Sequence, residues 1–282
     1  MKKILIAALI LLATPSLAGP ADKLALLQSK TIFRSGLRAT HTVALTFDDG
    51  PNVATLGVLK ALKDMNVKAT FFIVGKMAKA HPDVLAAVAA GGHLLGNHSS
   101  THPMLTKRYD ANPQLLLNQL RVVDQQISPL MQAGDIKYFR APYGYWRPAH
   151  AALLNADPVL RNYVGPIYWD IGGDISMKDG YVLSSADWDC WAHHWSAEVC
   201  AKGYIREIRR KDGGVVLMHS INKNAEALVR AVVPVLKEEG YTFVRLDQVP
   251  EYKQFETPDA GAVASNAKLL QSAALLAGRT VK

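Results

Sequence analysis

Leu45-Thr46-Phe47-Asp48-Asp49-Gly50-Pro51 is the stretch on which the prediction of the fold rests. It closes an apolar run, 42–47, with two adjacent carboxylates and then a Gly-Pro turn signal, as expected of a buried strand that ends at a polar edge. Six similar runs follow, separated by stretches whose apolar residues recur at helical spacing. The expected strands are 42–47, 69–74, 93–97, 137–141, 164–170, 214–218 and 241–245.

Seven strands that alternate with helices predict an α/β fold. The sheet is either a closed or nearly closed β/α barrel or a doubly wound open sheet. The polar residues favour the barrel, because they follow the C-terminal ends of predicted strands, where barrel enzymes gather their catalytic groups. These residues are Asp48, Asp49, His98, Arg140 and His219.

The adjacent carboxylates Asp48 and Asp49 leave the first strand in different directions. One of them can therefore bind a metal while the other faces a bound water, a division of labour that hydrolysis requires. Taken alone, Asp-Asp-Gly-Pro is also a good turn, and a purely structural role is the plainer alternative.

A second motif, Asn97-His98-Ser99-Ser100-Thr101-His102-Pro103, places two imidazoles four residues apart, which we expect to lie on one face of a helical turn. With Asp49, His98 and His102 form a set of two nitrogen ligands and one carboxylate, the makeup of a catalytic zinc site. Fe(II) oxygenases use the same set, so the ligands predict a divalent metal ion without naming it.

Two further strands end in basic side chains. Arg140, in Tyr138-Phe139-Arg140-Ala141-Pro142-Tyr143-Gly144, can hold Asp48 by a bidentate contact or form an ion pair of purely structural use. His219 ends the apolar strand Val215-Val216-Leu217-Met218 and is placed to protonate a leaving amine. We interpret the other histidines as surface or packing residues. These are His41, His81, His93, His150, His193 and His194.

Four short motifs occur in the order and spacing of the NodB-type polysaccharide deacetylases, carbohydrate esterase family 4. They are Thr46 to Gly50, His98 to His102, Arg140 to Tyr143 and Leu217 to His219, and the resemblance covers roughly residues 41–247. It implies a distorted seven-stranded β/α barrel, a divalent metal ion that is usually zinc, and hydrolysis of N-acetyl groups on chitin, peptidoglycan or related glycans.

The resemblance also implies roles for individual residues. Asp48 would be the general base, and Asp49, His98 and His102 the metal ligands. Arg140 would orient the base, and His219 would be the general acid. Pro142 and Tyr143 match one wall of the substrate groove, the backbone N–H of Tyr143 is the nearest candidate for binding the oxyanion, and Leu217 matches the residue that receives the acetyl methyl group.

The fourth family motif departs from the pattern, which has two aspartates, the second followed by tryptophan. Here Trp169-Asp170-Ile171-Gly172-Gly173-Asp174-Ile175 is compressed, and Ile175 stands where the tryptophan is expected. We expect Asp174 to be the carboxylate that tunes His219, with Asp170 as the other candidate.

The N-terminus reads as a secretory signal peptide, 1–18. Two lysines precede the apolar run Ile4 to Ala13, and Ser16-Leu17-Ala18 has the small-x-small pattern of a cleavage site. The remaining chain divides into an N-terminal extension, 19–40, a catalytic domain, 41–247, and a C-terminal extension, 248–282. The protein is therefore expected to be exported, to the periplasm or outside the cell.

Charge and hydropathy limit the partners. Loss of Lys2 and Lys3 with the signal peptide lowers the formal net charge from +8 to +6, which suits an anionic cell-wall polymer or lipid headgroups. The chain has no compact Lys/Arg run with interleaved aromatics, so nucleic-acid binding is disfavoured. No later stretch approaches the roughly 20 apolar residues of a membrane span. A glycan polymer is the expected partner.

The two cysteines, Cys190 and Cys200, predict a local disulfide in an oxidising compartment. A metal pair is the alternative, but it lacks the C-x-x-C spacing. The disulfide would pin a long excursion, 175–200, which has no clear periodicity. Its tryptophans, Trp188, Trp191 and Trp195, either line a sugar-binding cleft or pack the excursion onto the barrel.

Three alternatives stand beside an N-deacetylase. An O-acetyl esterase of polysaccharides would use the same residues. A glycan-binding module without turnover would lack a metal ligand or the base, and neither is missing from the sequence. An Fe(II) oxygenase would normally be an all-β jelly roll, whereas this chain alternates strands with helices.

Overall fold

The computed structural model describes residues 36–132, 134–253 and 255. The expected signal peptide, most of the N-terminal extension and residues 256–282 lie outside this part of the chain. None of the described helices is long and apolar enough to cross a membrane.

The sheet is built around strand β1 (Thr42–Asp48), and all of its pairings are parallel. The strand order is β4-β3-β2-β1-β7, and β8 also pairs with β1. β7 pairs with β1 over its whole length, whereas β8 pairs with the first half of β1 and β2 with the second half. The other strands are β2 (Thr70–Ile73), β3 (Leu94–Asn97), β4 (Tyr138–Phe139), β7 (Gly213–His219) and β8 (Thr242–Val244).

An irregular segment stands where the strand 164–170 was expected. It forms isolated parallel bridges at its two ends, from Val164 to Tyr138 of β4 and from Ile171 to Val216 of β7. A continuous ladder does not form there, partly because Pro166 has no N–H to donate. By bridging β4 and β7, the segment curls the six-stranded sheet into a distorted barrel, as predicted, and the open-sheet alternative is wrong.

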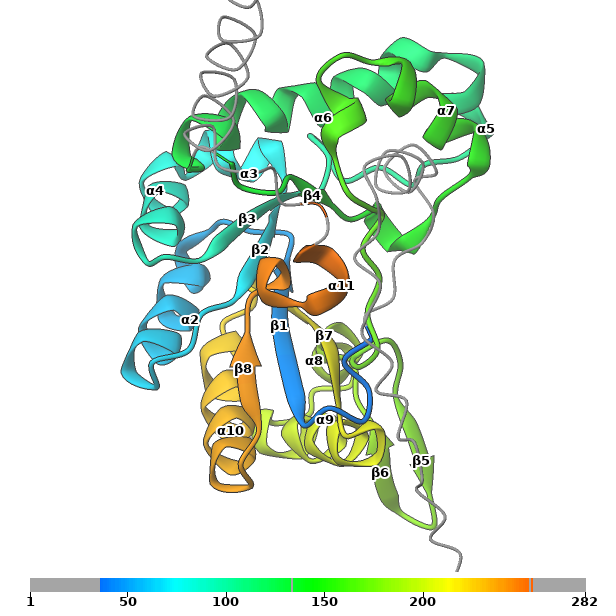
Figure 1. Cartoon of the computed structure of the whole chain (residues 1–282). Coiled ribbons are helices and arrows are strands. Elements are labelled where there is room, and N and C mark those ends of the chain that lie inside the picture. Colours follow the sequence, from blue (N-terminus) through cyan, green and yellow to red (C-terminus); the bar gives the residue numbers. More distant parts are fainter. Residues whose placement is uncertain (1–35, 133, 254, 256–282) are drawn as a thin grey trace, which may run out of the picture.

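Helices cover the outer face of the barrel (Figure 1). The longer ones are α2 (Val53–Asp64), α4 (Pro82–Ala90), α6 (Pro113–Ile127), α9 (Ala197–Lys211) and α10 (Ala225–Glu238). α10 shows how they pack: Leu228, Val232 and Leu236 repeat at helical spacing and are almost fully buried against the sheet. Each such side chain contributes roughly 1.5–3 kcal/mol by its removal from water. Shorter helices are α3 (Gly75–Ala80), α5 (Lys107–Ala111), α7 (Pro148–Ala156), α8 (Asp187–Ala192) and α11 (Pro250–Lys253).

The core extends past the residues at which the catalytic domain was expected to begin and end. Leu37, before β1, and Val249 and Tyr252, after β8, belong to the same buried cluster as Ala44 and Val215 in the middle of the sheet. The short helix α11 therefore packs as part of the barrel.

The excursion 175–200 has regular structure. It contains an antiparallel hairpin, β5 (Ser176–Lys178) and β6 (Tyr181–Ser184), which projects from the barrel in Figure 1, and then α8 and the start of α9. The disulfide between Cys190 and Cys200 is present, as predicted, and joins α8 to α9. Both cysteines are fully buried.

We expect the double substitution Cys190→Ser/Cys200→Ser to lower the free energy of unfolding by roughly 2–3 kcal/mol, because the disulfide closes a short loop in the unfolded chain. Denaturant unfolding of the oxidised wild type and the variant measures this difference. Wild-type protein treated with a thiol reductant should unfold like the variant. Equal stability of the oxidised wild type and the variant would contradict the prediction.

Candidate active site

The ends of β1 and β3 bring three predicted metal ligands together. Nε2 of His102 lies 3.2 Å from Oδ1 of Asp49, and Nε2 of His98 lies 3.5 Å from the same oxygen. The ligand atoms of Asp49, His98 and His102 all lie within 4.8 Å of one another, and they form the one such group among the described residues.

The loop that carries the two histidines is not the helical turn that was expected. Ser99 and His102 both adopt left-handed backbone conformations, with φ of 68° and 55°, and Asp49 does so as well, with φ of 71°. Such conformations are costly for residues other than glycine and persist only where surrounding contacts hold them. Here the side chain of Asn97 accepts a hydrogen bond from the N–H of Ser99, whose hydroxyl accepts one from the N–H of His102.

The protonation of His98 suits metal binding. Its Nδ1–H donates to the carbonyl oxygen of Arg140 at 2.8 Å, so Nε2 carries the free lone pair. Burial lowers the pKa of His98 to about 3, against the opposing charge of Asp49, and the ring is therefore neutral at physiological pH. The buried Oδ1 of Asp49 has no hydrogen-bond partner. An orphaned carboxylate oxygen beside the Nε2 atoms of two imidazoles fits a divalent metal ion.

Asp48 lies beside this cluster and is held by Arg140. The Nη1 atom of Arg140 donates to Oδ1 of Asp48 at 2.7 Å, and the second carboxylate oxygen lies 3.4 Å from Nε2 of His98. The expected bidentate contact is wrong, because Nη1 is shared with the hydroxyl of Thr46 and Nε donates to the carbonyl of Ile167.

Asp48 and Arg140 are both buried, and the guanidinium of Arg140 lies 4.2 Å from the ring centre of Phe72. Burial raises the pKa of Asp48, while the charge of Arg140 works in the opposite direction. A carboxylate with a raised pKa binds a proton more strongly, which suits a general base.

His219 stands at the end of β7 and is paired with Asp187. The ring Nδ1–H donates to Oδ1 of Asp187 at 2.7 Å, and the backbone N–H of His219 donates to Oδ2, also at 2.7 Å. Burial lowers the pKa of His219, but the charge and hydrogen bond of Asp187, together with Asp48 and Asp49, outweigh it and raise the pKa to about 9. The imidazole is thus protonated at neutral pH.

The expectation that Asp174 tunes His219 is therefore wrong. Asp174 is exposed, and the carboxylate of Asp170 accepts from Arg38 and from the N–H of Val215. Asp187 is followed by Trp188 and so matches the aspartate-tryptophan pair of the fourth family motif. The β5–β6 hairpin separates this pair from Trp169-Asp170. The motif is interrupted, not compressed, and the dipeptide Asp187-Trp188 is the signal in the sequence that identifies the partner of His219.

A cavity of about 650 Å³ opens over these groups. Its walls include Tyr143, Trp188, Trp191 and Leu217. Tyr143 and Leu217 thus lie where the resemblance implies, whereas Pro142 is buried and does not line the cavity. Trp188 and Trp191 line the cleft, and Trp191 and Trp195 pack against the core, so the cleft hypothesis and the packing hypothesis each hold for two of the three tryptophans.

The fold and the site define a metal-binding β/α barrel, and comparison with known proteins assigns it to a family. Residues 37–159 match the polysaccharide deacetylase family model. A chitooligosaccharide deacetylase of Sinorhizobium fredii is 40% identical over 238 residues, covering 78% of this chain and 96% of that protein. The chain belongs to the polysaccharide deacetylase family.

Other relatives share only part of their length or only the fold. The peptidoglycan-N-acetylglucosamine deacetylase PgdA of Listeria monocytogenes is 31% identical over 75% of this chain, which spans 39% of that enzyme. The structure of the Bc1960 peptidoglycan N-acetylglucosamine deacetylase matches with a TM-score of 0.59 at 26% identity, covering 77% of this chain and 91% of that one. BA3943 of Bacillus anthracis, a CE4 family pseudoenzyme, has the same fold, with a TM-score of 0.61, 21% identity and coverage of 78% and 69%.

We expect Asp187→Asn to lower the pKa of His219 from about 9, because the carboxylate that raises it most is removed while burial still lowers it. Titration of the imidazole nitrogens by NMR measures this shift. A raised pKa stabilises the fold below the ordinary value of 6.5, and this stabilisation is lost as the pH rises through about 9. The free energy of unfolding of Asp187→Asn should therefore not fall in this way as the pH rises through about 9. Asp174→Asn is the matched control, and a shift in it equal to that of Asp187→Asn would contradict the pairing.

Proposed function

We propose that the protein is an exported, metal-dependent hydrolase that removes N-acetyl groups from an amino-sugar polymer of the cell envelope. One observation carries the proposal: a single cavity holds the metal-ligand cluster, the buried carboxylate of Asp48 and the protonated imidazole of His219. These are the binding group, the base and the acid that hydrolysis of an amide requires.

A divalent metal ion, with zinc as the first choice, would be held by Asp49, His98 and His102 and would polarise the acetamide carbonyl and acidify a water. Asp48 takes the proton of the attacking water, and Arg140 keeps its carboxylate oriented. The backbone N–H of Tyr143 binds the oxyanion, and Leu217 receives the acetyl methyl group. His219 gives its proton to the departing nitrogen, and acetate and a free amine leave.

Removal of an N-acetyl group needs a general acid more than removal of an O-acetyl group does. The reason is that an amine leaves from a tetrahedral intermediate only after its nitrogen is protonated. The raised pKa of His219 keeps that proton available at neutral pH. The relatives named for deacetylation of N-acetylglucosamine or chitooligosaccharides support the same substrate class. O-acetyl esterase activity on polysaccharides is the second candidate, since the same groups can hydrolyse an ester.

Export to the periplasm or beyond the cell is part of the proposal. It is supported by the apolar leader-like start of the sequence and by the buried disulfide, which forms in an oxidising compartment.

The aromatic walls of the cavity, Tyr143, Trp188 and Trp191, suit the apolar faces of sugar rings. Among envelope polymers, peptidoglycan is our first choice.

We expect Asp48→Asn to retain the bound metal and to lower acetate release by about 10²-fold or more, because the base is lost while the ligands remain. His98→Ala should lose both the metal and the activity. Metal analysis of the purified variants, with an acetate assay, measures the two effects separately. Asp174→Asn, on the exposed loop nearby, serves as the control with unchanged activity. Wild-type turnover by Asp48→Asn would overturn the assignment of the base.

A panel of peptidoglycan, chitin oligomers, poly-N-acetylglucosamine and acetylxylan tests the substrate class. We expect acetate from at least one N-acetylated glycan, abolished by a chelator and restored by zinc, because the ligand cluster is required for activity. Release from acetylxylan alone would replace the proposal with the O-acetyl esterase. No release from any polymer by metal-loaded protein would point to a glycan-binding module instead.

A further inference from the structure

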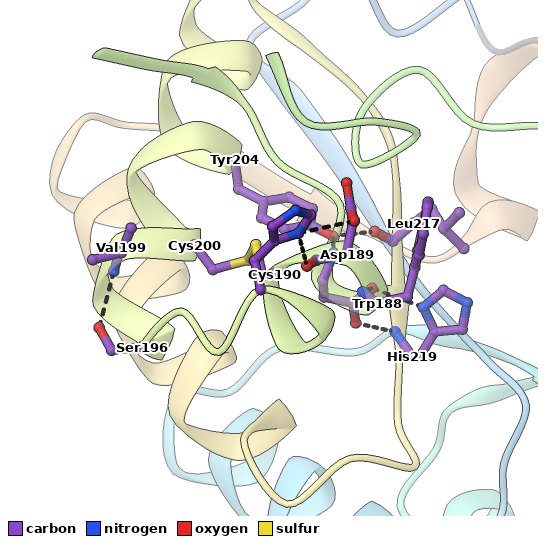
Figure 2. Close-up of a disulfide and its surroundings, with 11 residues drawn as sticks. Trp188, Asp189, Cys190, Ser196, Val199, Cys200, Tyr204, Leu217 and His219 are labelled. Carbon is purple, nitrogen blue, oxygen red and sulfur yellow. Dashed lines mark hydrogen bonds and ion pairs between the residues drawn. A yellow bond between two sulfur atoms is a disulfide. The ribbon is translucent and has the colours of Figure 1, made fainter. Parts of the chain in front are cut away.

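Tyr204 on α9 bridges the two segments that carry the proposed acid, His219 on β7, and its partner, Asp187 on α8. Its side chain is fully buried, and its hydroxyl lies between two backbone groups. The N–H of Asp187 donates to the hydroxyl oxygen at 3.0 Å, and the hydroxyl donates to the carbonyl oxygen of Leu217, also at 3.0 Å. Figure 2 shows Tyr204 beside α8, with Leu217 and His219 on the neighbouring strand.

The two backbone groups belong to the residues that determine where His219 points. Asp187 begins α8 and holds the ring and the backbone N–H of His219 through its two carboxylate oxygens. Leu217 precedes His219 by two positions on β7 and lines the cavity. A single oxygen that accepts from one segment and donates to the other therefore sets the distance between α8 and the end of β7.

The carboxylate of Asp187 accepts three hydrogen bonds, two of them from His219. Its Oδ1 also accepts from the N–H of Trp188 at 2.8 Å, so a shift of α8 would move the hydrogen bond to the ring and a tryptophan of the cavity wall together. The disulfide also links α8 to α9, from Cys190 after Asp187 on α8 to Cys200 one turn before Tyr204 on α9, but it makes no bond to β7. Tyr204, in contrast, is bonded to both α8 and β7.

We propose that Tyr204 is a positioning residue for the acid step: its hydroxyl aligns Asp187 with the end of β7 and so directs His219 toward the leaving nitrogen. This inference rests on the proposed function, because it assigns Tyr204 to the acid step of that reaction. The hydroxyl stays protonated and able to donate, since burial and the charge of Asp187 raise the pKa of Tyr204 well above its ordinary value.

Tyr204→Phe tests the role with the smallest change, because the ring still fills its place in the core and only the hydroxyl is lost. Two substrates report on different steps. An N-acetylglucosamine oligomer needs a proton on its leaving nitrogen, whereas 4-nitrophenyl acetate releases a phenolate that leaves without one. A defect of the acid step therefore appears on the first substrate alone.

We expect kcat of Tyr204→Phe on the oligomer to fall about 10-fold, as a misdirected acid loses part of its rate contribution, with little change in KM. Turnover of the aryl ester and the metal content should stay within about 2-fold of wild type, because the metal ligands and the base are untouched. Tyr163→Phe is the matched control. It removes another buried hydroxyl, bonded to Asp124 on α6, and should leave the ratio of the two activities unchanged.

A double-mutant cycle shows whether Tyr204 acts through Asp187. In the Asp187→Asn background, Tyr204→Phe should lower oligomer turnover no further, because the pair that it aligns is already broken. Additive losses would overturn the inference. So would an equal fall on both substrates, or an unchanged rate on the oligomer.

Should Tyr204→Phe fail to fold, a fluorinated tyrosine at position 204 keeps the ring and hydroxyl but weakens the oxygen as an acceptor, and the selective loss on the oligomer is expected again. An equal response of both substrates to that residue would overturn the inference. A wild-type protein that turns over neither substrate would instead reject the proposed function, which separates the two failures.

Discussion

The parallel ladder between β1 and β7 pairs Asp48 with His219 at its last position. The proposed base and the proposed acid, far apart in the chain, thereby become neighbours at one end of the barrel. Because side chains alternate between the faces of a strand, a slip of one residue in this ladder would turn either group away from the cavity. The register is held along seven consecutive pairs, and the flanking helices bury the apolar residues of both strands.

Several buried polar groups lie at this end of the barrel, and each needs a hydrogen-bond partner because it has no contact with water. Arg140 is among the largest fully buried side chains of the described residues, and it is held by Asp48, Thr46 and the carbonyl of Ile167. Its own carbonyl oxygen accepts from His98, so one residue braces both the base and a metal ligand. Burial then separates the protonation states, because it keeps His98 neutral while the facing carboxylate of Asp187 keeps His219 charged.

The loops beyond the strands complete the site through short-range contacts that the strands do not dictate. The left-handed residues Asp49, Ser99 and His102 turn the metal ligands toward one point, and side-chain hydrogen bonds to the backbone hold that conformation. Near His219, α8 carries Asp187 and Trp188 and is fastened to α9 by the disulfide and by Tyr204. Both sides of the site thus depend on bonds that reach from a loop or short helix to a neighbouring element.

The sequence by itself determined the βα alternation, the strand ends and the metal-ligand cluster, because apolar periodicity and turn residues are local signals and parallel strands present their C-terminal ends at one edge. It also determined the pairing of the two cysteines. Only the tertiary structure decided that Asp187, not Asp174, pairs with His219, that the expected strand 164–170 is interrupted, and that the histidine loop is not helical. Asp187 meets His219 through a contact between segments distant in the chain, and an inserted hairpin changes the spacing of the motif without changing where its side chains meet. The histidine loop depends instead on left-handed backbone conformations that hydrogen bonds to the side chains of Asn97 and Ser99 hold, and residue spacing alone does not encode these conformations.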